Sequence, residues 1–365
     1  MIFLLLACLT VVVFLLPYGL ISANPFPRPS GQWPVGSSDF IWNLPTHSGI
    51  IAKIWYPNNA KNHSSSPYID HLGLTLSAIT AGLGPLSRLI FNKFYLGRIQ
   101  IPSEVDATLA ERQGNFPIIL FSPGFGGINF LNSFYALEFA SHGFIVISIN
   151  HPQWSSGTIL VDGSHVPFNG IDFNKVDIDR AEKLLATTIS QKANNLSAVL
   201  DELLDLNKSD DSWLYQKIDP SKVFAVGHSS GGSASFLACE RDSRITKSVN
   251  LDGFLYQDRI DVFVMEKEFL LILSNRDKYA PQGNKTPNIF DLLMAKDQTR
   301  VAQFSGQKNV HKYLLNSANH WSFMDLSLII TPLLSKRLGW FGEIKGLDLM
   351  SETSETIIDF FNEAD

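Results

Sequence analysis

One serine of the chain lies in a setting that is typical of a nucleophile. Ser229 is the central residue of the turn Gly227-His-Ser-Ser-Gly231, which follows a short apolar run and precedes small residues that open a helix. A strand, a Gly-x-Ser-x-Gly turn and a helix in this order hold the serine hydroxyl exposed on a sharp corner above a sheet. The glycines let the backbone turn and let the helix approach the strand closely. Such a serine indicates nucleophilic attack on an ester or an amide.

The serine needs a histidine as its base, because a hydroxyl is a weak nucleophile at neutral pH. The partners of such a serine follow in the chain order serine, acid, histidine, so the base is expected on a loop after the last strand. His320 comes directly after the apolar run 312–315 and meets this condition. The rival His311 precedes that run and is expected at the opposite edge of the sheet, and the other seven histidines lie at or before the serine turn.

Two aspartates could be the acid that orients the histidine. Asp252 ends the apolar run after the nucleophile helix, and Asp277 follows the next apolar run. Position slightly favours Asp277, because many α/β-hydrolases place the acid after the later strand. Against it, Arg276 and Lys278 flank Asp277 and suggest a solvated turn, whereas Asp252 leaves an apolar strand directly into Gly-Phe. The residues alone leave both candidates open.

Two backbone N–H groups are needed to hold the negative oxygen that develops during such an attack. One is expected from Ser230, the residue after the nucleophile. The second is expected from the glycine-rich turn Gly124-Phe-Gly-Gly127, with Phe125 as the donor. The alternative is an ordinary turn, but this one follows a buried type of strand in a chain that also has the serine turn.

The elements that must position these residues alternate between strands and helices. Continuous apolar runs, typical of strands buried on both faces, separate segments with helical spacing. The expected strands are residues 49–57, 117–121, 144–149, 222–226, 248–251, 269–273 and 312–316, and the expected helices are 133–142, 178–206 and 357–364. This order predicts an α/β-hydrolase fold with a mostly parallel central sheet and helices on both faces, in a single domain over residues 24–365.

Composition narrows the location and the partners of the protein. The chain has 365 residues, 45% of them hydrophobic, and its net charge of -6 argues against nucleic acid as a main partner. The apolar segment 2–16 and the small residues near Ala23 predict a secretory signal peptide over residues 1–23. An uncleaved membrane anchor is the alternative, but Pro17 interrupts the apolar run.

The remaining motifs are weak signals. Cys239 would have no partner in the mature chain and is expected to be a small buried packing residue. Four Asn-x-Ser/Thr triplets agree with a secreted glycoprotein, at Asn62, Asn195, Asn207 and Asn284. The sequence has no His-Glu-x-x-His motif or other ligand cluster, so neither a metal nor another cofactor is expected.

Several segments together resemble the plasma-type platelet-activating factor acetylhydrolases, which are lipoprotein-associated, calcium-independent phospholipases. The resemblance is carried by Phe121-Ser-Pro-Gly-Phe-Gly, Ala140-Ser-His-Gly-Phe-Ile-Val, Gly227-His-Ser-Ser-Gly-Gly, Leu251-Asp-Gly-Phe and His320-Trp-Ser-Phe-Met-Asp325. It implies Ser229 as nucleophile, Asp252 as acid and His320 as base, and it implies Phe125 and Ser230 as the oxyanion donors. Positions that depart from the family pattern are expected to line the substrate pocket: Pro123, Ser230, Gly253 and Trp321.

The resemblance implies a secreted serine esterase for the sn-2 acetyl, short or oxidised acyl ester of platelet-activating factor and related glycerophospholipids. The products would be a lysophospholipid and a carboxylate. One alternative is a broad secreted carboxylesterase or polyester hydrolase. Another is a hydrolase-like fold that serves lipid binding or adhesion without turnover.

Members of this family also contact lipid surfaces through exposed apolar helices. In residues 85–95 one helical face would carry Leu86, Leu89, Ile90 and Phe94, which is an interfacial pattern. A second candidate surface for a lipid or a lipoprotein ends in Trp340 and Phe341. The alternative for both segments is packing against the sheet.

Overall fold

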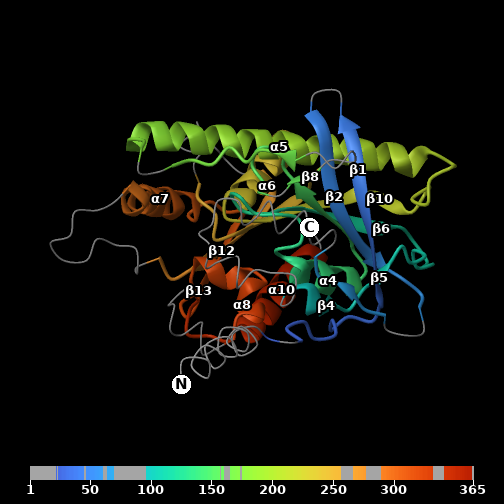
Figure 1. Cartoon of the computed structure of the whole chain (residues 1–365). Coiled ribbons are helices and arrows are strands. Elements are labelled where there is room, and N and C mark those ends of the chain that lie inside the picture. Colours follow the sequence, from blue (N-terminus) through green and yellow to red (C-terminus); the bar gives the residue numbers. More distant parts are fainter. Residues whose placement is uncertain are drawn as a thin grey trace, which may run out of the picture.

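A nine-stranded sheet forms the centre of the molecule, with the strand order β13-β12-β11-β10-β6-β7-β2-β1-β5 (Figure 1). The computed structural model describes residues 22, 24–44, 47–60, 64–69, 96–156, 158–159, 165–172, 175–255, 266–276, 289–331 and 341–363. The predicted signal peptide, except Ser22, lies outside these residues. Within them, no helix is both long and apolar enough to cross a bilayer.

The strands on one side of the sheet are parallel, and those at the other edge are mixed. The parallel strands are β6 (Phe116–Ser122), β7 (Ile145–Asn150), β10 (Ile218–His228), β11 (Lys247–Leu251), β12 (Glu268–Ser274) and β13 (Val310–Leu315). Strand β2 (His47–Pro57) is antiparallel to both β7 and β1 (Val35–Leu44), and β5 (Glu104–Val105) is parallel to β1. The mostly parallel sheet predicted from the apolar runs is confirmed, and every residue of β7 is buried.

Helices cover both faces of the sheet (Figure 1). They are α4 (Ser133–Ser141), α5 (Ile178–Lys208), α6 (Ser230–Arg241), α7 (Ile289–Phe304), α8 (Leu326–Ile329) and α10 (Gly346–Asn362). Successive residues of a strand point to opposite faces. On β6, Ile119 and Phe121 therefore pack in the core with α4 and α10, whereas Ile118 and Leu120 pack with α5 and α6. The sheet is thus held between two apolar layers.

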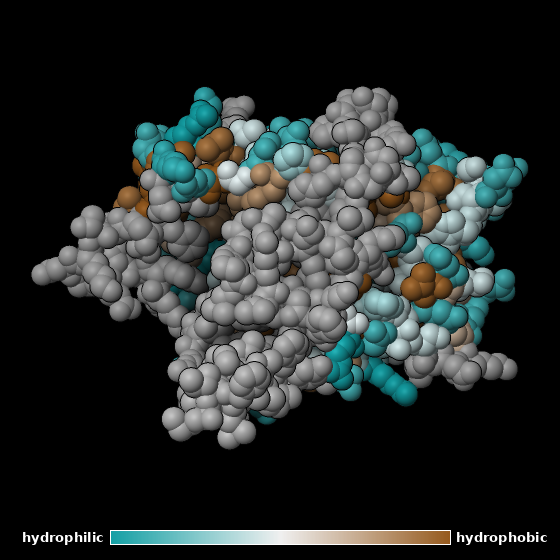
Figure 2. Space-filling view, viewed as in Figure 1, coloured by the Kyte–Doolittle hydropathy of each residue, from teal (hydrophilic) through white to brown (hydrophobic). Residues whose placement is uncertain are grey.

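Shorter elements connect this frame. They are β3 (Ser66–Pro67), β4 (Gln100–Ile101), β8 (Thr158–Ile159), β9 (His165–Val166) and the 3-10 turns η2 (Leu96–Arg98) and η5 (His320–Phe323). On the face shown in Figure 2, hydrophilic and hydrophobic residues alternate over the coloured surface. The exposed large side chains Val105 and Leu314 lie on the two edge strands of the sheet, β5 and β13, and single exposed apolar side chains are usual for a protein surface.

The structure corrects two predicted element positions. The last helix begins at Gly346 instead of residue 357, because polar residues such as Thr353 and Ser354 occupy buried positions and weaken the apolar period. His311 does not precede the last strand but lies within β13, where it is paired with Leu270. In addition, β1 was not predicted, because its serines and Asp39 interrupt the alternation of apolar residues.

The predicted buried position of Cys239 is confirmed, and burial raises the pKa of its thiol to about 11. Of the four Asn-x-Ser/Thr triplets, the one at Asn195 lies inside α5, where the Asn195 side chain is 2% exposed and hydrogen-bonded to His151, so the folded protein has no room for a glycan there. The Asn207 side chain is half-buried and binds the backbone of Lys217 and Ile218. Asn62 and Asn284 lie outside the described residues.

Candidate active site

The Gly-x-Ser-x-Gly turn joins the end of β10 to the start of α6. Ser229 has a φ of 56° and a ψ of -129°, a region that costs free energy for a residue with a side chain. Its N–H donates to the carbonyl oxygen of Leu251 at 2.9 Å, which ties the turn to the neighbouring strand. A Cβ atom on Gly231 would lie 2.0 Å from the carbonyl oxygen of Ser122, so only glycine fits there. The strained corner is therefore held from both sides.

Replacing Gly231 with alanine is expected to lower the free energy of unfolding by about 3 kcal/mol, because the backbone around Ser122 must move to admit the methyl group. Gly306→Ala is the matched control, since its Cβ would meet only the Gln303 carbonyl oxygen, at 3.5 Å. Denaturant unfolding of both variants measures the difference. Equal stabilities would show that the corner is not tightly packed.

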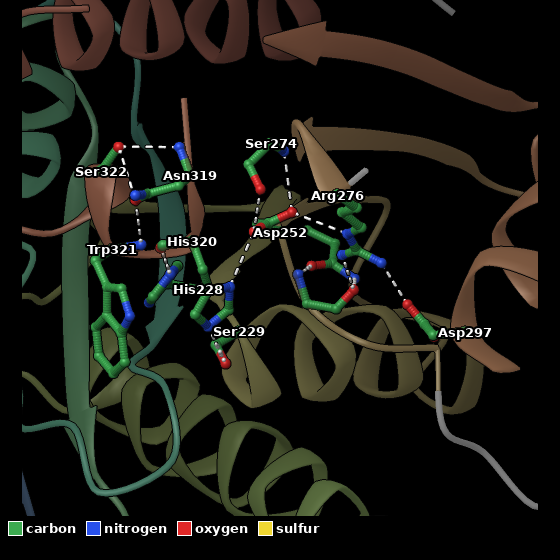
Figure 3. Close-up of polar contacts among 12 residues, drawn as sticks. His228, Ser229, Asp252, Ser274, Arg276, Asp297, Asn319, His320, Trp321 and Ser322 are labelled. Atoms are coloured by element: carbon green, nitrogen blue, oxygen red, sulfur yellow. Dashed lines mark hydrogen bonds and ion pairs between the residues drawn. The ribbon is translucent and has the colours of Figure 1, made fainter. Parts of the chain in front are cut away.

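Three side chains from separate loops meet at the carboxyl edge of the sheet (Figure 3). Ser229 Oγ is 3.0 Å from His320 Nε2, and His320 Nδ1 is 2.9 Å from Asp252 Oδ2. The ionised carboxylate only accepts, so Nδ1 carries the proton and Nε2 is free to accept the serine proton. The residues follow β10, β11 and β13, whose carboxyl ends all lie at this edge. Geometrically, this arrangement can activate the serine hydroxyl.

The competing candidates are placed differently. His311 lies at the opposite end of β13 from His320, where its Nε2 atom contacts Glu268 Oε2 at 2.5 Å. Asp277 lies outside the described residues. Of the candidate bases and acids, the structure brings His320 and Asp252 to the serine.

The Asp252 carboxylate is fully surrounded by donors. It is 1% exposed and accepts hydrogen bonds from Ser274 N at 3.0 Å, Ser274 Oγ at 2.7 Å and Arg276 Nε at 3.1 Å. Burial by itself would raise the pKa of Asp252, but the Arg276 guanidinium and the bonds from His320 and Ser274 outweigh it and hold the pKa far below its usual value. Asp252 is therefore a fixed anion behind the imidazole.

Arg276 is a buried counter-ion, and the predicted solvated turn at this residue is wrong. Its side chain is 6% exposed and bonds Asp252 and Asp297 (Figure 3). It also donates to the Gly253 carbonyl oxygen at 3.1 Å. Asp297 comes from α7 and also accepts from the Leu255 N–H at 2.6 Å. The chain order hides this pairing, because Asp297 lies 21 residues after Arg276 in a helix that was not predicted from the sequence. Ser274, Arg276 and Asp297 are site residues that sequence reasoning did not identify.

Two further residues fix the loop that carries His320. Asn319 forms a capping box with Ser322 at the start of η5. His228 Nε2 donates to the His320 carbonyl oxygen at 2.9 Å, and the two imidazole rings lie 4.8 Å apart. Burial, with a contribution from His320, lowers the pKa of His228 to about 3. The neutral His228 side chain thus fixes the backbone of His320 through this hydrogen bond.

The two predicted oxyanion donors lie on either side of Ser229. Ser230 opens α6, and Phe125 follows Gly124, whose Cβ position would be 3.2 Å from Ser229 Cβ. Among the described residues, no acceptor takes a hydrogen bond from the backbone N–H of Phe125 or of Ser230. Both groups are therefore available to an oxygen bound at the serine.

The positions that depart from the family pattern do not all line a pocket. The Ser230 hydroxyl is buried and lies 3.2 Å from Lys192 Nζ. A Cβ atom on Gly253 would lie 2.1 Å from the Ser229 carbonyl oxygen, so that residue is required by the backbone. Trp321 is 50% exposed and its ring packs edge-on against His320, 5.7 Å between centroids. Of these three, only Trp321 can contact a bound molecule through an exposed side chain.

The chain is similar to known proteins over most of its length. The family model "Platelet-activating factor acetylhydrolase, isoform II" matches residues 18–365. The platelet-activating factor acetylhydrolase of Bos taurus is 26% identical over 282 residues, which cover 71% of this chain and 62% of the bovine protein. That of Cavia porcellus is 22% identical over 360 residues, which cover 93% of this chain and 76% of the relative. The chain thus spans less than two thirds of the bovine relative.

A fungal protein and a solved structure are also similar to this chain. A probable 1-alkyl-2-acetylglycerophosphocholine esterase of Arthroderma benhamiae is 26% identical over 146 residues, covering 40% of this chain and 33% of that protein. A solved structure of a ferulic acid esterase from Streptomyces cinnamoneus superposes with a TM-score of 0.67 at 17% identity, covering 92% of this chain and 91% of that chain. This likeness confirms the predicted α/β-hydrolase fold.

Proposed function

Because the chain belongs to the family of platelet-activating factor acetylhydrolase, isoform II, whose model spans residues 18–365, we propose that it is a serine esterase for glycerophospholipids. Its substrates would carry an acetyl, short or oxidised acyl group at the sn-2 position. The hydrogen-bonded series Ser229, His320 and Asp252 supports this proposal. The names of the bovine, guinea-pig and fungal relatives support the choice of substrate.

The reaction would proceed through an acyl-enzyme. His320 Nε2 takes the Ser229 proton while Oγ bonds to the ester carbonyl carbon, and the N–H groups of Phe125 and Ser230 hold the resulting oxyanion. The carbon–oxygen bond to the glycerol then breaks, His320 returns its proton to that oxygen, and the lysophospholipid leaves. Water attacks the acyl group with His320 again as base, which releases the carboxylate and restores Ser229. Asp252 stays ionised and fixes the imidazole.

A panel of phosphatidylcholines with sn-2 chains of graded length tests the proposal. Turnover of the acetyl form is expected to exceed that of the sn-2 palmitoyl form by at least about 10²-fold, the range that pocket contacts with several methylenes can supply. Hydrolysis of p-nitrophenyl acetate without any phospholipid turnover would identify a broad carboxylesterase instead. A protein that neither turns over esters nor reacts with a fluorophosphonate would be a lipid-binding or adhesion protein.

We also propose that the protein is secreted and acts at a lipid or lipoprotein surface. The segment with Leu86, Leu89, Ile90 and Phe94 lies outside the described residues, as does Trp340, whereas Phe341 is half-buried. The signal peptide over residues 1–23 and the single domain over residues 24–365 stay predictions, and so does the expectation that nucleic acid is not a partner.

A further inference from the structure

A buried lysine contacts two segments next to Ser229, the turn after β6 and the start of α6. Lys192, on α5, is 0% exposed. Its Nζ atom donates to the carbonyl oxygens of Pro123 at 2.8 Å and Gly124 at 2.9 Å, and it contacts Ser230 Oγ at 3.2 Å. An ammonium group has three N–H donors, and these three acceptors satisfy all of them. No carboxylate of the described residues forms an ion pair with it.

Two of the three acceptors of Lys192, the Gly124 carbonyl oxygen and Ser230 Oγ, are directly connected to the two proposed oxyanion donors. The Gly124 carbonyl and the Phe125 N–H are the two ends of one peptide group. A hydrogen bond from a cation to the oxygen of that group draws electron density from its nitrogen and strengthens the N–H as a donor. The third acceptor is the side chain of Ser230, whose own N–H is the second donor. One cation therefore contacts both halves of the proposed oxyanion hole.

A neighbouring network fixes the same turn from the strand side. The Asn195 amide nitrogen lies 3.2 Å from His151 Nδ1, and His151 Nε2 lies 2.8 Å from Ser122 Oγ. Since an amide N–H only donates, Nδ1 accepts and Nε2 carries the proton. His151 thus donates to Ser122 and cannot act as its base. The hydrogen bonds of His151 and Ser122 thus fix the end of β6 before Pro123. They involve neutral groups, so the charge that can act on the oxyanion hole is that of Lys192.

We propose that Lys192 is a positioning residue of the oxyanion hole, which holds the Gly124–Phe125 peptide and Ser230 in place and polarises the Phe125 N–H toward the developing oxyanion. The inference rests on the proposed esterase function. Burial lowers the pKa of Lys192 to about 7. The three oxygen atoms that accept from Nζ favour the ammonium form, because hydrogen bonds to a charged form stabilise it. Burial is the largest cause of the lowered pKa values of His151 and His228, and the nearby positive charge of Lys192 lowers both pKa values further.

The test is Lys192→Met, which keeps the apolar stem and removes the charge. We expect kcat for an ester substrate, phospholipid or p-nitrophenyl acetate, to fall by about 10²-fold, while KM changes by less than about three-fold. The inhibition constant of a trifluoromethyl ketone, whose adduct with a serine carries an oxyanion, should rise by the same factor as kcat falls. If Lys192 only stabilised the fold, the fall in kcat and the rise in the inhibition constant would not be equal.

Two variants complete the design. Thr188→Val is the matched control, because Thr188 is buried one turn earlier on α5 and its hydroxyl donates only to the Leu184 carbonyl oxygen, at 2.9 Å. It should keep the wild-type kcat and inhibition constant. If Lys192→Met fails to fold, Lys192→Gln keeps two donors without the charge and should show the same linked losses.

The outcomes separate the two proposals. An active wild type together with an equally active Lys192→Met or Lys192→Gln variant overturns the role of Lys192 alone. So does a loss of kcat without any change in the inhibition constant. A wild-type protein that is inert toward every ester overturns the proposed function, and the role of Lys192 with it.

Discussion

Replacing Ser229 with alanine is expected to lower kcat for ester hydrolysis by about 10⁴-fold or more and to abolish labelling by a fluorophosphonate. The hydroxyl is the only group within hydrogen-bonding distance of His320 Nε2 among the described residues. Its removal leaves no buried charge unpaired, because the His320–Asp252 contact is untouched. The variant should therefore fold, and its free energy of unfolding should change by less than about 1 kcal/mol.

Ser235→Ala is the control for this experiment. Ser235 is another buried serine of α6, and its hydroxyl donates to the Gly231 carbonyl oxygen at 2.9 Å, away from His320. It should keep the wild-type kcat and full labelling. Turnover of Ser229→Ala at the rate of this control would mean that the nucleophile is another residue, and the proposed mechanism would be wrong.

The candidate nucleophile was predictable from a continuous segment of sequence, and the candidate base from its place in the order of the chain. The strand, turn and helix around Ser229 are continuous in the sequence, and His320 is the only histidine after the last strand. The acid was different, since Asp252 and Asp277 both follow apolar strands. Only the family resemblance chose between them, because the choice depends on which carboxylate is buried and reaches the imidazole.

The residues that support the site could not be recognised from the sequence, because their partners are distant in the chain. Arg276 looks like part of a charged turn until Asp252 and Asp297 are brought beside it. Lys192 looks like any lysine of a long amphipathic helix, and its three acceptors come from the turn after β6 and from the first residue of α6. Burial of a charge is a property of the fold, and local spacing does not reveal it.

The fold itself was predictable where burial on both faces imposes continuous apolar runs, as in β6, β7 and β12. It was not predictable where buried positions are polar. In β1, Ser37 is buried through its bond to Ser103, and in α10 Thr353 and Ser354 are buried. The same property that hides Arg276 and Lys192 thus hides structural elements as well.

Replacing Arg276 with methionine is expected to lower the free energy of unfolding by about 3–5 kcal/mol, because it leaves two buried carboxylates without a counter-ion. The matched control is Arg244→Met. Arg244 also pairs with two carboxylates, Asp201 and Asp242, but it lies at the surface with 35% of its side chain exposed. The control should lose about 1 kcal/mol or less.

The pH dependence distinguishes a counter-ion from a packing residue. In the wild type the pKa of Asp252 is below its ordinary value, so its contribution to stability is present above about pH 4 and is lost as the pH falls further. Without Arg276, burial dominates and the pKa of Asp252 rises. The stability gap between wild type and variant should then widen as the pH rises from about 4 to about 8. The acid limb of kcat should also move to higher pH, because a protonated Asp252 cannot stabilise the His320 imidazolium.

The double variant Arg276→Met with Asp297→Asn separates the two carboxylates that Arg276 serves. Neutralising Asp297 removes one unpaired charge and should recover part of the lost stability, measured by denaturant unfolding. It should not restore the acid limb of kcat, because Asp252 still lacks its counter-ion. If the single variant keeps the wild-type pH profile, Arg276 acts only through packing, and the fixed anion behind His320 must depend on the Ser274 hydrogen bonds instead.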